Sequence, residues 1–201
     1  MLVQSDTTDE SSTFSDASGS NHTLAKTGTV NHETDQKKFG SSSIFFQGSD
    51  DYLSVADSDD WDFGTGEFTV ELWLKSTRDG TSGSQLLSTK SSGWASGNGW
   101  ALVHWGVSGH MSFQNGTTIY QDNNQSDGVD IGFSGNWHHV AVTRSGTSLR
   151  FFVDGDLKKT FTISATLAFD SDGSGLRIGS NWSSHEAMGY MEDIRITKGV
   201  A

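Results

Sequence analysis

The 201-residue chain contains no cysteine and no proline. Without cysteine it can form neither a disulfide bond nor a thiolate metal site, so neither contributes to its stability. Without proline, its turns must depend on glycine, asparagine and aspartate, which tolerate the backbone angles of tight turns. The 24 glycines, together with many serines, threonines, aspartates and asparagines, meet that need. The composition therefore indicates a protein with many turns.

Basic residues are also scarce: 13 Lys and Arg stand against 25 Asp and Glu, a formal net charge of -12. Such a chain lacks the basic stripe of a nucleic-acid-binding protein, so we expect no nucleic-acid partner. No apolar run approaches the length of about 20 residues that spans a membrane, so we expect no membrane insertion. The first residues, MLVQSDTTDE, lack the basic and apolar regions of a secretory signal. We expect Met1 to begin a domain excised from a longer chain.

The clearest structural pattern lies in residues 136–155, NWHHVAVTRSGTSLRFFVDG. Val140 and Val142 alternate with small or polar residues, and after Ser-Gly-Thr the alternation resumes with Phe151 and Val153. A period of two places each set on one face of a sheet. The pattern predicts a β-hairpin whose apolar face is buried. Because a lone hairpin is marginally stable, it must belong to a larger sheet.

Many other short segments have the alternation or the β-branched and aromatic content of strands, and no segment has a helical period of useful length. Residues 68–75 alternate most cleanly, and Asn115-Gly116 is a strong hairpin signal. The other predicted strands are residues 44–46, 52–55, 86–88, 100–105, 110–114, 117–121, 157–163, 176–178 and 190–197. Many short strands separated by regular turns predict an all-β fold, a two-sheet antiparallel β-sandwich or jelly roll.

Five segments resemble a known family and occur in its order. They are FGSSSI (39–44), GSDDYLSV (48–55), WDFGTGEFTVELWL (61–74), WHHVAVTRSGTSLRFFVDG (137–155) and GYMEDIRITKGV (189–200). In this order they resemble the laminin-G-like domains of the concanavalin A-like lectin/glucanase superfamily. The form with WDFGTG and ITKGVA is similar to repeats in phage and marine microbial surface proteins. The resemblance implies a single domain over residues 1–201 with the concanavalin A-like fold.

The same resemblance bears on catalysis. Catalytic glucanases of the superfamily carry an E-x-D-x-E cluster on a central strand, because retaining chemistry needs two carboxyl groups about 5 Å apart. Here Glu71 stands alone in TVELWLK, and Glu192 and Asp193 lie on the closing strand. A G-x-S-x-G nucleophile motif is absent as well. We therefore expect no enzymatic activity.

The resemblance also implies one structural Ca²⁺ ion. The closing strand of the family commonly reads D-x-V-R-V, with its acid on the metal, and the opening loop D-x-S-G-x-x-H resembles FSDASGSNH (14–22) here. The predicted ligands are Asp16, the carbonyl of Gly48, Glu192 and Asp193. Calcium prefers six to eight oxygen ligands, which separated segments can supply. The alternative is a solvated acidic pair neutralised in part by Arg195; a second site in residues 122–130 lacks EF-hand spacing and is left open.

The aromatic residues suggest where a ligand binds. Flat aromatic faces stack on sugars, and Asn or His side chains bond their hydroxyls. In WALVHW (100–105) a period of two puts aromatic residues on both faces, so one face carries an aromatic away from the core. The loop GSNWSSH (179–185) adds an exposed candidate, whereas Trp137 is expected inside the sandwich. The predicted ligand surface, on the concave sheet and its rim, comprises Trp100, His104, Trp105, Asn181, Trp182 and His185.

Two functions are compatible with these features. The first is a non-catalytic recognition module that binds a glycan or cell-surface polysaccharide, displayed on a phage tail or another extracellular surface assembly. The second is a structural or adhesion domain of a virion or surface protein, which contacts other chains and has no small-molecule pocket. Both place the protein outside the cell or on a virion surface. The fold alone does not distinguish them, since the superfamily contains both.

Overall fold

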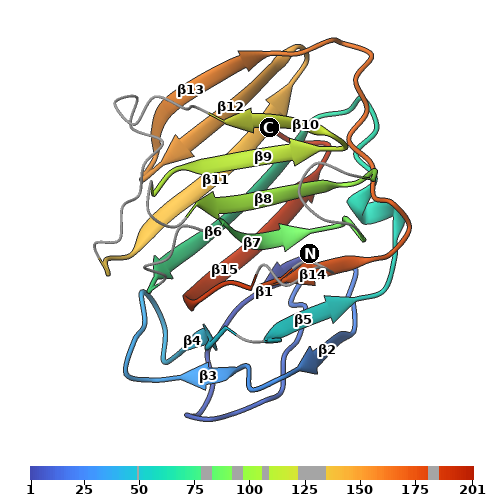
Figure 1. The fold of residues 1–201 in the computed structure, drawn as a ribbon. Coiled ribbons are helices and arrows are strands. Elements are labelled where there is room, and N and C mark those ends of the chain that lie inside the picture. The colour runs from blue at the N-terminus through green and yellow to red at the C-terminus, as the bar shows by residue number, and fades with distance from the viewer. Residues whose placement is uncertain (49, 78–82, 92–96, 106–108, 122–134, 181–185) are drawn as a thin grey trace.

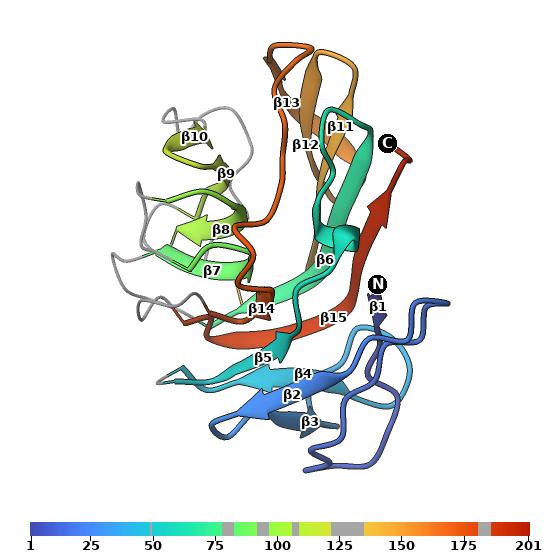
Figure 2. The same ribbon diagram turned by 90° about the vertical axis from the view of Figure 1, so that its right-hand side faces the viewer.

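The computed structural model describes residues 1–48, 50–77, 83–91, 97–105, 109–121, 135–180 and 186–201. These residues form two antiparallel sheets packed face to face (Figures 1 and 2). Within these ranges the one helical segment is a single 3₁₀ turn at Asp59–Trp61. No helix of the described part is long and apolar enough to cross a membrane. The predicted two-sheet antiparallel sandwich is confirmed.

The first sheet has eight strands, in the order β13-β12-β11-β6-β15-β4-β3, with β1 also paired to β15. Its strands are β1 (Leu2–Val3), β3 (Asn31–Glu33), β4 (Ser43–Phe46), β6 (Phe68–Ser76), β11 (His138–Ser145), β12 (Ser148–Val153), β13 (Asp156–Thr162) and β15 (Gly189–Lys198). Because β1 and β15 are neighbours, the first and last strands of the chain lie side by side. The N-terminal amine of Met1 donates a hydrogen bond to the carbonyl of Ile196 at 3.0 Å.

The second sheet has seven strands, in the order β10-β9-β8-β7-β14-β5-β2. Its strands are β2 (Leu24–Thr27), β5 (Tyr52–Val55), β7 (Gly83–Ser88), β8 (Trp100–Trp105), β9 (Met111–Asn115), β10 (Thr118–Gln121) and β14 (Leu176–Ile178). The predicted hairpin over Asn115-Gly116 is formed by β9 and β10. The predicted strand at residues 100–105 is β8, with the same bounds.

The predicted central hairpin is formed by β11 and β12, and its apolar face points into the core. Val142 pairs with Phe151 on one side and with Val70 of β6 on the other. These residues belong to a set that is at most 5% exposed: Phe68, Val70, Leu72, Val140, Val142, Phe151 and Val153. The period of two therefore assigned this face correctly, because a strand presents alternate side chains to opposite sides.

One end of the core is an aromatic cluster. Trp100 stacks on Phe63 and Phe113, with ring centroids 5.2 and 5.7 Å apart, and Phe169 lies 5.8 Å from Phe113. The indole N–H of Trp100 donates to the carbonyl of Trp61 at 2.8 Å. Since these rings are buried, they fix the segments that carry them.

Trp137 does not lie inside the sandwich as predicted. It precedes the first residue of β11 and is half-buried, and its ring lies 6.5 Å from that of Tyr190. Tyr190 pairs with Lys75 of β6, on the outer face of the eight-stranded sheet. The prediction is wrong because Trp137 lies before the alternation of β11 begins.

Candidate functional site

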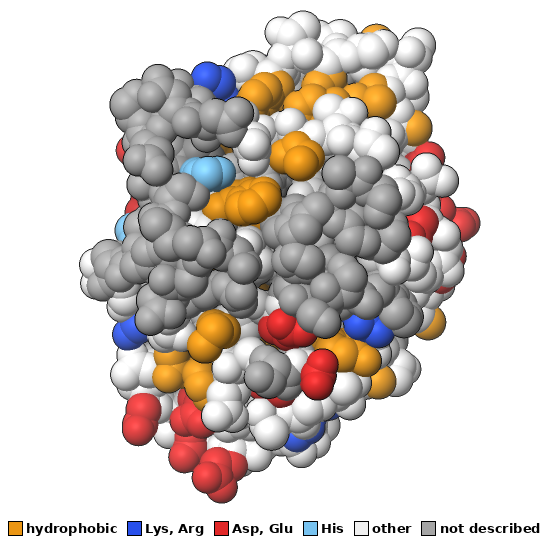
Figure 3. All heavy atoms as spheres, in the orientation of Figure 1, with side chains coloured by type: hydrophobic (Ala, Val, Ile, Leu, Met, Phe, Trp, Pro, Cys, Tyr) orange, Lys and Arg blue, Asp and Glu red, His pale blue; other side chains and the backbone are white. Residues whose placement is uncertain are grey.

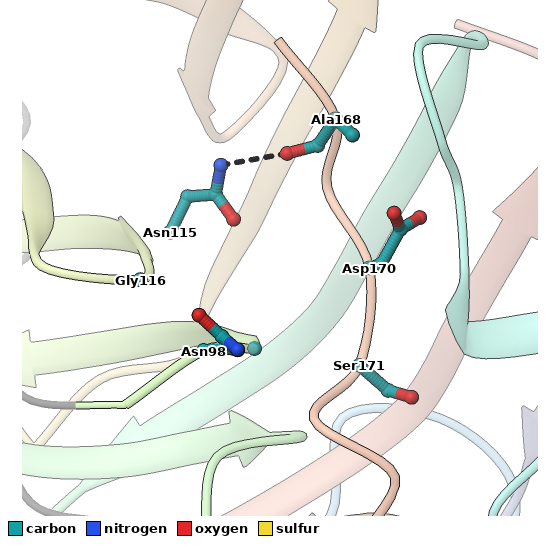
Figure 4. Close-up of a pocket in the computed structure, with 7 residues that line it drawn as sticks. Asn98, Asn115, Gly116, Ala168, Asp170 and Ser171 are labelled. Carbon is teal, nitrogen blue, oxygen red and sulfur yellow. Dashed lines mark hydrogen bonds between the residues drawn. The ribbon is translucent and has the colours of Figure 1, made fainter.

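A polar cavity of about 390 Å³ lies at the end of the seven-stranded sheet where β9 ends and β10 begins. Figure 4 shows residues that line it. Three segments far apart in sequence form it. Its described lining residues are Asn98 and Gly99 before β8, Asn115 at the end of β9 with Gly116 after it, and Ala168, Asp170 and Ser171 before β14. The cavity is therefore assembled by the tertiary structure.

Two hydrogen bonds join the three segments. The N–H of Gly116 donates to the carbonyl of Gly99 at 2.8 Å, and the side-chain N–H of Asn115 donates to the carbonyl of Ala168 at 2.8 Å (Figure 4). Gly99 has φ +86°, and a Cβ there would meet the carbonyl oxygen of Thr89 at 2.7 Å. Glycine is needed at this position because the backbones approach closely at a positive φ.

Lys90 supports the cavity from within the protein. Its side chain is fully buried, and Nζ donates to the carbonyl of Gly116 at 2.5 Å. Burial lowers the pKa of the Lys90 ammonium, and the neighbouring carboxylate of Asp172 opposes that shift. Lys90 therefore holds the β9–β10 turn in place rather than facing a ligand.

The segment 168–171 is fixed to residues 57–64. Phe169 is fully buried, and its N–H donates to the carbonyl of Gly64 at 2.9 Å. In return the N–H of Gly64 donates to Oδ1 of Asp170 at 2.7 Å. The N–H of Ser171 donates to Asp62 at 2.6 Å. With each residue held by its own partner, the cavity wall is preformed.

Arg144 joins the same loops, and the sequence analysis missed it. The guanidinium is fully buried and donates to the carbonyls of Gly64 at 3.1 Å and Leu167 at 2.5 Å. It also donates to the carbonyls of Ala165 and Gly146, both at 3.3 Å. The period of two already placed Arg144 on the inner face of β11 with Val142, so an inward arginine was the available signal.

Several groups of the cavity are left for a ligand. Asn98 is exposed, and no hydrogen bond of its amide to another described residue is present. Asn115 uses its N–H on Ala168, which leaves Oδ1 as an acceptor. Asp170 uses Oδ1 for Gly64, which leaves Oδ2. An amide, an amide oxygen and a carboxylate oxygen around one cavity suit a ligand rich in hydroxyl groups.

Trp100 and His104 do not lie at a ligand surface as predicted. Trp100 is 0% and His104 1% exposed, and both point between the sheets, where Nδ1 of His104 lies 3.5 Å from Oγ of Ser76. The alternation along β8 was right, but the face with Trp100 is the buried one. A large aromatic ring fills the interior of a sandwich better than it covers a solvated edge.

Trp105 is the member of the predicted set that faces outward on β8. It is half-buried, its indole N–H donates to Oγ of Ser112 at 2.9 Å, and its ring stacks on His110 at 5.9 Å. It lies at the opposite end of β8 from the cavity. The other predicted residues, Asn181, Trp182 and His185, lie outside the described residues.

The outer face of the seven-stranded sheet also carries buried amides that the sequence analysis missed. Gln85 pairs with Val103, and Gln114 pairs with Ala101, and both glutamines are 0% exposed. Neither amide has a hydrogen-bond partner in the described part of the chain. Neither amide is therefore presented at the surface. Figure 3 views the molecule from this side. In the cavity, by contrast, Asn98 and Asp170 are exposed, so the cavity is the candidate site.

The predicted calcium ligand Asp16 has other partners. Its Oδ1 accepts the N–H groups of Leu2 at 2.8 Å and Ser18 at 2.9 Å, and Oδ2 accepts the N–H of His22 at 3.0 Å. Burial alone would raise the pKa of Asp16, but these donors outweigh it and hold the pKa at about 2. Asp16 thus fastens the opening loop to β1.

Glu192 is likewise held by backbone donors. It is 3% exposed, and its two oxygens accept the N–H groups of Lys38 at 2.7 Å and Phe39 at 3.0 Å. Burial raises the pKa of Glu192 despite these donors. The alternative, a solvated pair of Glu192 and Asp193 neutralised in part by Arg195, is wrong for Glu192, because Glu192 is buried and Arg195 lies 3.4 Å from Glu71.

The remaining predicted ligands are also engaged. Oδ1 of Asp193 accepts from the side chain of Gln4 at 2.8 Å, and the carbonyl of Gly48 accepts the N–H of Asp51 at 3.3 Å. In the described ranges no group of three or more His, Asp or Glu side chains could hold a metal ion. As they lie, the predicted residues do not fit one shared Ca²⁺ ion.

We expect excess EDTA to leave the melting temperature unchanged, because Asp16 and Glu192 are already satisfied by protein N–H groups. Thermal unfolding followed by circular dichroism, with EDTA and then with added CaCl₂, measures this. A ligand that binds the folded state raises its stability, so an increase with Ca²⁺ would contradict the expectation. An increase that Asp16→Asn abolishes would restore the predicted site, and one that persists in this variant would point to residues 122–130.

Residues 47–200 match the sequence model of a family described as the concanavalin A-like lectin/glucanases superfamily. The chain belongs to this superfamily. The resemblance inferred from the five segments is therefore confirmed. A search of curated proteins finds no match to the chain.

Several solved structures have the same fold as this chain. Domain 4 of AbnA, an extracellular GH43 arabinanase from Geobacillus stearothermophilus solved with arabinotriose, has a TM-score of 0.68 at 15% identity, covering 99% of this chain and 94% of that one. The ligand-binding domain of botulinum neurotoxin serotype D, solved with N-acetylneuraminic acid, has a TM-score of 0.72 at 14% identity. The binding domain of Paraclostridial Mosquitocidal Protein 1 has a TM-score of 0.72 at 15% identity. The chain is covered completely in both toxin comparisons but spans 48% of each toxin domain.

Proposed function

We propose that the chain is a non-catalytic glycan-binding module and that its site is the cavity of Asn98, Asn115 and Asp170. The observation that carries the proposal is a preformed cavity of about 390 Å³ whose available side chains are amides and a carboxylate. Its volume falls within the range of about 300–1,000 Å³ usual for ligand pockets. Its lining is more polar than that of most such pockets. A ligand must therefore exchange many hydrogen bonds with it.

A glycan meets this requirement better than an apolar ligand. Sugar hydroxyls both donate and accept, so they can pair with the amide of Asn98 and with the free oxygens of Asn115 and Asp170. The loops are held in place by Arg144, Lys90 and the buried Phe169, so little ordering is needed on binding. A small polar site of this kind supports affinities from millimolar to micromolar, about -4 to -8 kcal/mol.

The structural relatives support the same ligand class. The arabinanase domain was solved with arabinotriose and the neurotoxin domain with N-acetylneuraminic acid. At 14–15% identity these structures share only the fold with this chain, so they suggest the class of ligand to test first.

The described part of the site does not carry the pair of carboxyl groups that glycoside hydrolysis uses. Asp170 is the one carboxylate among the described residues that line the cavity. Glu71, on the eight-stranded sheet, lies 3.2 Å from Nε2 of His139 and 3.4 Å from Arg195. These partners lower the pKa of Glu71, chiefly through the hydrogen bond from His139 and against the effect of burial. Glu71 is therefore a paired anion rather than a catalytic acid.

We place the module on the outside of a cell or virion, on a phage tail or another surface assembly. The support is the similarity of WDFGTG and ITKGVA to repeats of phage and marine microbial surface proteins. The second candidate function is a structural or adhesion domain that contacts other chains. That function needs no ligand in the cavity, so a binding experiment separates the two.

We expect Asn98→Ala to weaken glycan binding at least about tenfold, or about 1.4 kcal/mol, because it removes the most exposed amide of the site. A glycan array first selects the ligand, and calorimetry then compares the variant with the unmodified protein. Gln47→Ala, which removes an exposed amide that does not line the cavity, is the control and should bind normally.

The melting temperatures of both variants should match that of the unmodified protein, since Asn98 has an exposed side chain. A glycan that binds Asn98→Ala and the unmodified protein equally well would move the site elsewhere. An array on which no glycan binds would favour the structural or adhesion function.

A further inference from the structure

The charge around the cavity limits which glycans can enter it. Among the described residues that line it, Asp170 is the one charged residue. Its Oδ1 accepts a single backbone N–H, that of Gly64, and no cation is paired with it among the described residues. A ligand in the cavity therefore meets a negative charge directly.

Further carboxylates lie behind this wall. Ser171 donates its N–H to Oδ1 of Asp62 at 2.6 Å and its hydroxyl to Oδ1 of Asp57 at 3.0 Å. The next residue, Asp172, accepts the N–H of Ser91 at 2.5 Å and that of Ser174 at 3.0 Å. Including Asp170, four carboxylates thus surround one short segment of the cavity wall.

Two cations near these loops, Lys90 and Arg144, do not face the cavity. Lys90 is fully buried, with Nζ bonded to the carbonyl of Gly116. Arg144 is fully buried as well, and its N–H groups donate to backbone carbonyls, including those of Gly64 and Leu167. Charge-assisted hydrogen bonds from such groups are the strong contacts that a carboxylate or sulfate makes with a protein. Here the N–H groups of Lys90 and Arg144 already donate to backbone carbonyls of the protein.

An anionic sugar therefore binds this cavity more weakly than a neutral one, for two reasons. Its charge is repelled by Asp170 and the carboxylates around Ser171, and the described lining residues include no Lys or Arg to bind it. A neutral sugar instead donates hydrogen bonds from its hydroxyl groups to the free oxygen of Asp170. The net charge of -12 adds a longer-range repulsion that salt screens. Acidic side chains are indeed more widespread than basic ones on the face shown in Figure 3.

We infer that the cavity selects neutral glycans and rejects sialylated, sulfated and uronic-acid glycans. This inference rests on the proposed function, because it concerns the same cavity. It separates this chain from the neurotoxin domain solved with N-acetylneuraminic acid, although the two share a fold. The selection is a property of the site's charge, and a repulsive element of this kind is a general source of specificity.

The test is an array of matched neutral and anionic probes. The neutral probes are arabinotriose, mannotriose, cellotriose and N-acetyllactosamine; the anionic probes are N-acetylneuraminic acid, trigalacturonic acid and the sialylated and sulfated forms of N-acetyllactosamine. We expect at least one neutral probe to bind at least about tenfold more tightly than every anionic probe at low salt. Added salt should narrow the difference in affinity between neutral and anionic probes, because it screens the repulsion of the anionic ones.

Asp170→Asn tests the cause. The amide retains an oxygen for the N–H of Gly64 but carries no charge, so the ratio of anionic to neutral binding should rise at least about threefold. Asp156→Asn, an exposed carboxylate on β13 that does not line the cavity, is the matched control and should leave the ratio unchanged. The melting temperature shows that each variant is folded.

The outcomes are distinct. Binding of an anionic probe as tightly as, or more tightly than, every neutral one overturns the inference while the proposed function stands. Equal ratios for Asp170→Asn and Asp156→Asn overturn it too, because the selection then has another cause. Binding of no probe at all contradicts the proposed function and the inference together. Tight neutral binding, with a ratio that rises only in Asp170→Asn, supports both.

Discussion

Replacing Arg144 with methionine should lower the free energy of unfolding by about 3–5 kcal/mol. The guanidinium is fully buried and donates to the carbonyls of Gly64, Leu167, Ala165 and Gly146. A buried polar group left without its partner costs about 1–3 kcal/mol, and methionine replaces none of these donors. The change should also weaken glycan binding, since residues 165–171 lose their attachment to β11. Urea denaturation measures the stability, and calorimetry measures the binding.

Arg150→Met is the matched control for this change. Arg150 lies on the neighbouring strand β12, opposite Thr143, and is half-buried on the outer face. We expect it to cost less than about 1 kcal/mol, because substitutions at such surface positions have small effects. Equal losses for the two variants would show that Arg144 is no more important than an arginine on the surface.

Phe151→Ala should cost a similar amount, about 3–5 kcal/mol. Phe151 is 2% exposed, pairs with Val142 across the hairpin, and contacts the ring of Phe161 edge to face at 5.6 Å. Truncation removes the apolar contacts of a whole ring and leaves a cavity between the sheets. The midpoint of urea denaturation should fall accordingly.

The neighbouring Phe152 is the control, since it has the same side chain on the opposite face of β12. It is half-buried and outside the core, so Phe152→Ala should cost clearly less than Phe151→Ala. A larger loss for Phe152→Ala would reverse the face assigned to the central hairpin.

The sequence determined the sheets because strand patterns are local. The alternation in residues 68–75 and in the central hairpin identifies the buried face without reference to any partner strand. Asn115-Gly116 likewise determines a tight turn by its own backbone preferences, and the β9–β10 hairpin forms there. Since one face of each sheet must be buried, these patterns were enough to predict two packed sheets.

The candidate site was much less accessible from sequence. Its side chains come from three distant segments: Asn98 before β8, Asn115 at the end of β9 and Asp170 before β14. No local pattern marks an exposed asparagine as a site residue. The alternation of β8 showed that Trp100 and Trp105 face opposite ways, but which face is buried depends on the opposing sheet.

For the acidic residues too, the sequence determined one part of the answer and the tertiary structure the other. The resemblance to the family singled out Asp16 and Glu192, near the two ends of the chain, as metal ligands. The fold buries both. Whether a buried carboxylate binds a metal ion or a backbone N–H depends on which groups the fold brings within hydrogen-bond distance. Here the backbone N–H groups of Leu2, Ser18 and His22 donate to the carboxylate of Asp16. Local periodicity thus determined the strands and their faces, while contacts between distant segments decided the partners, because only folding brings those segments together.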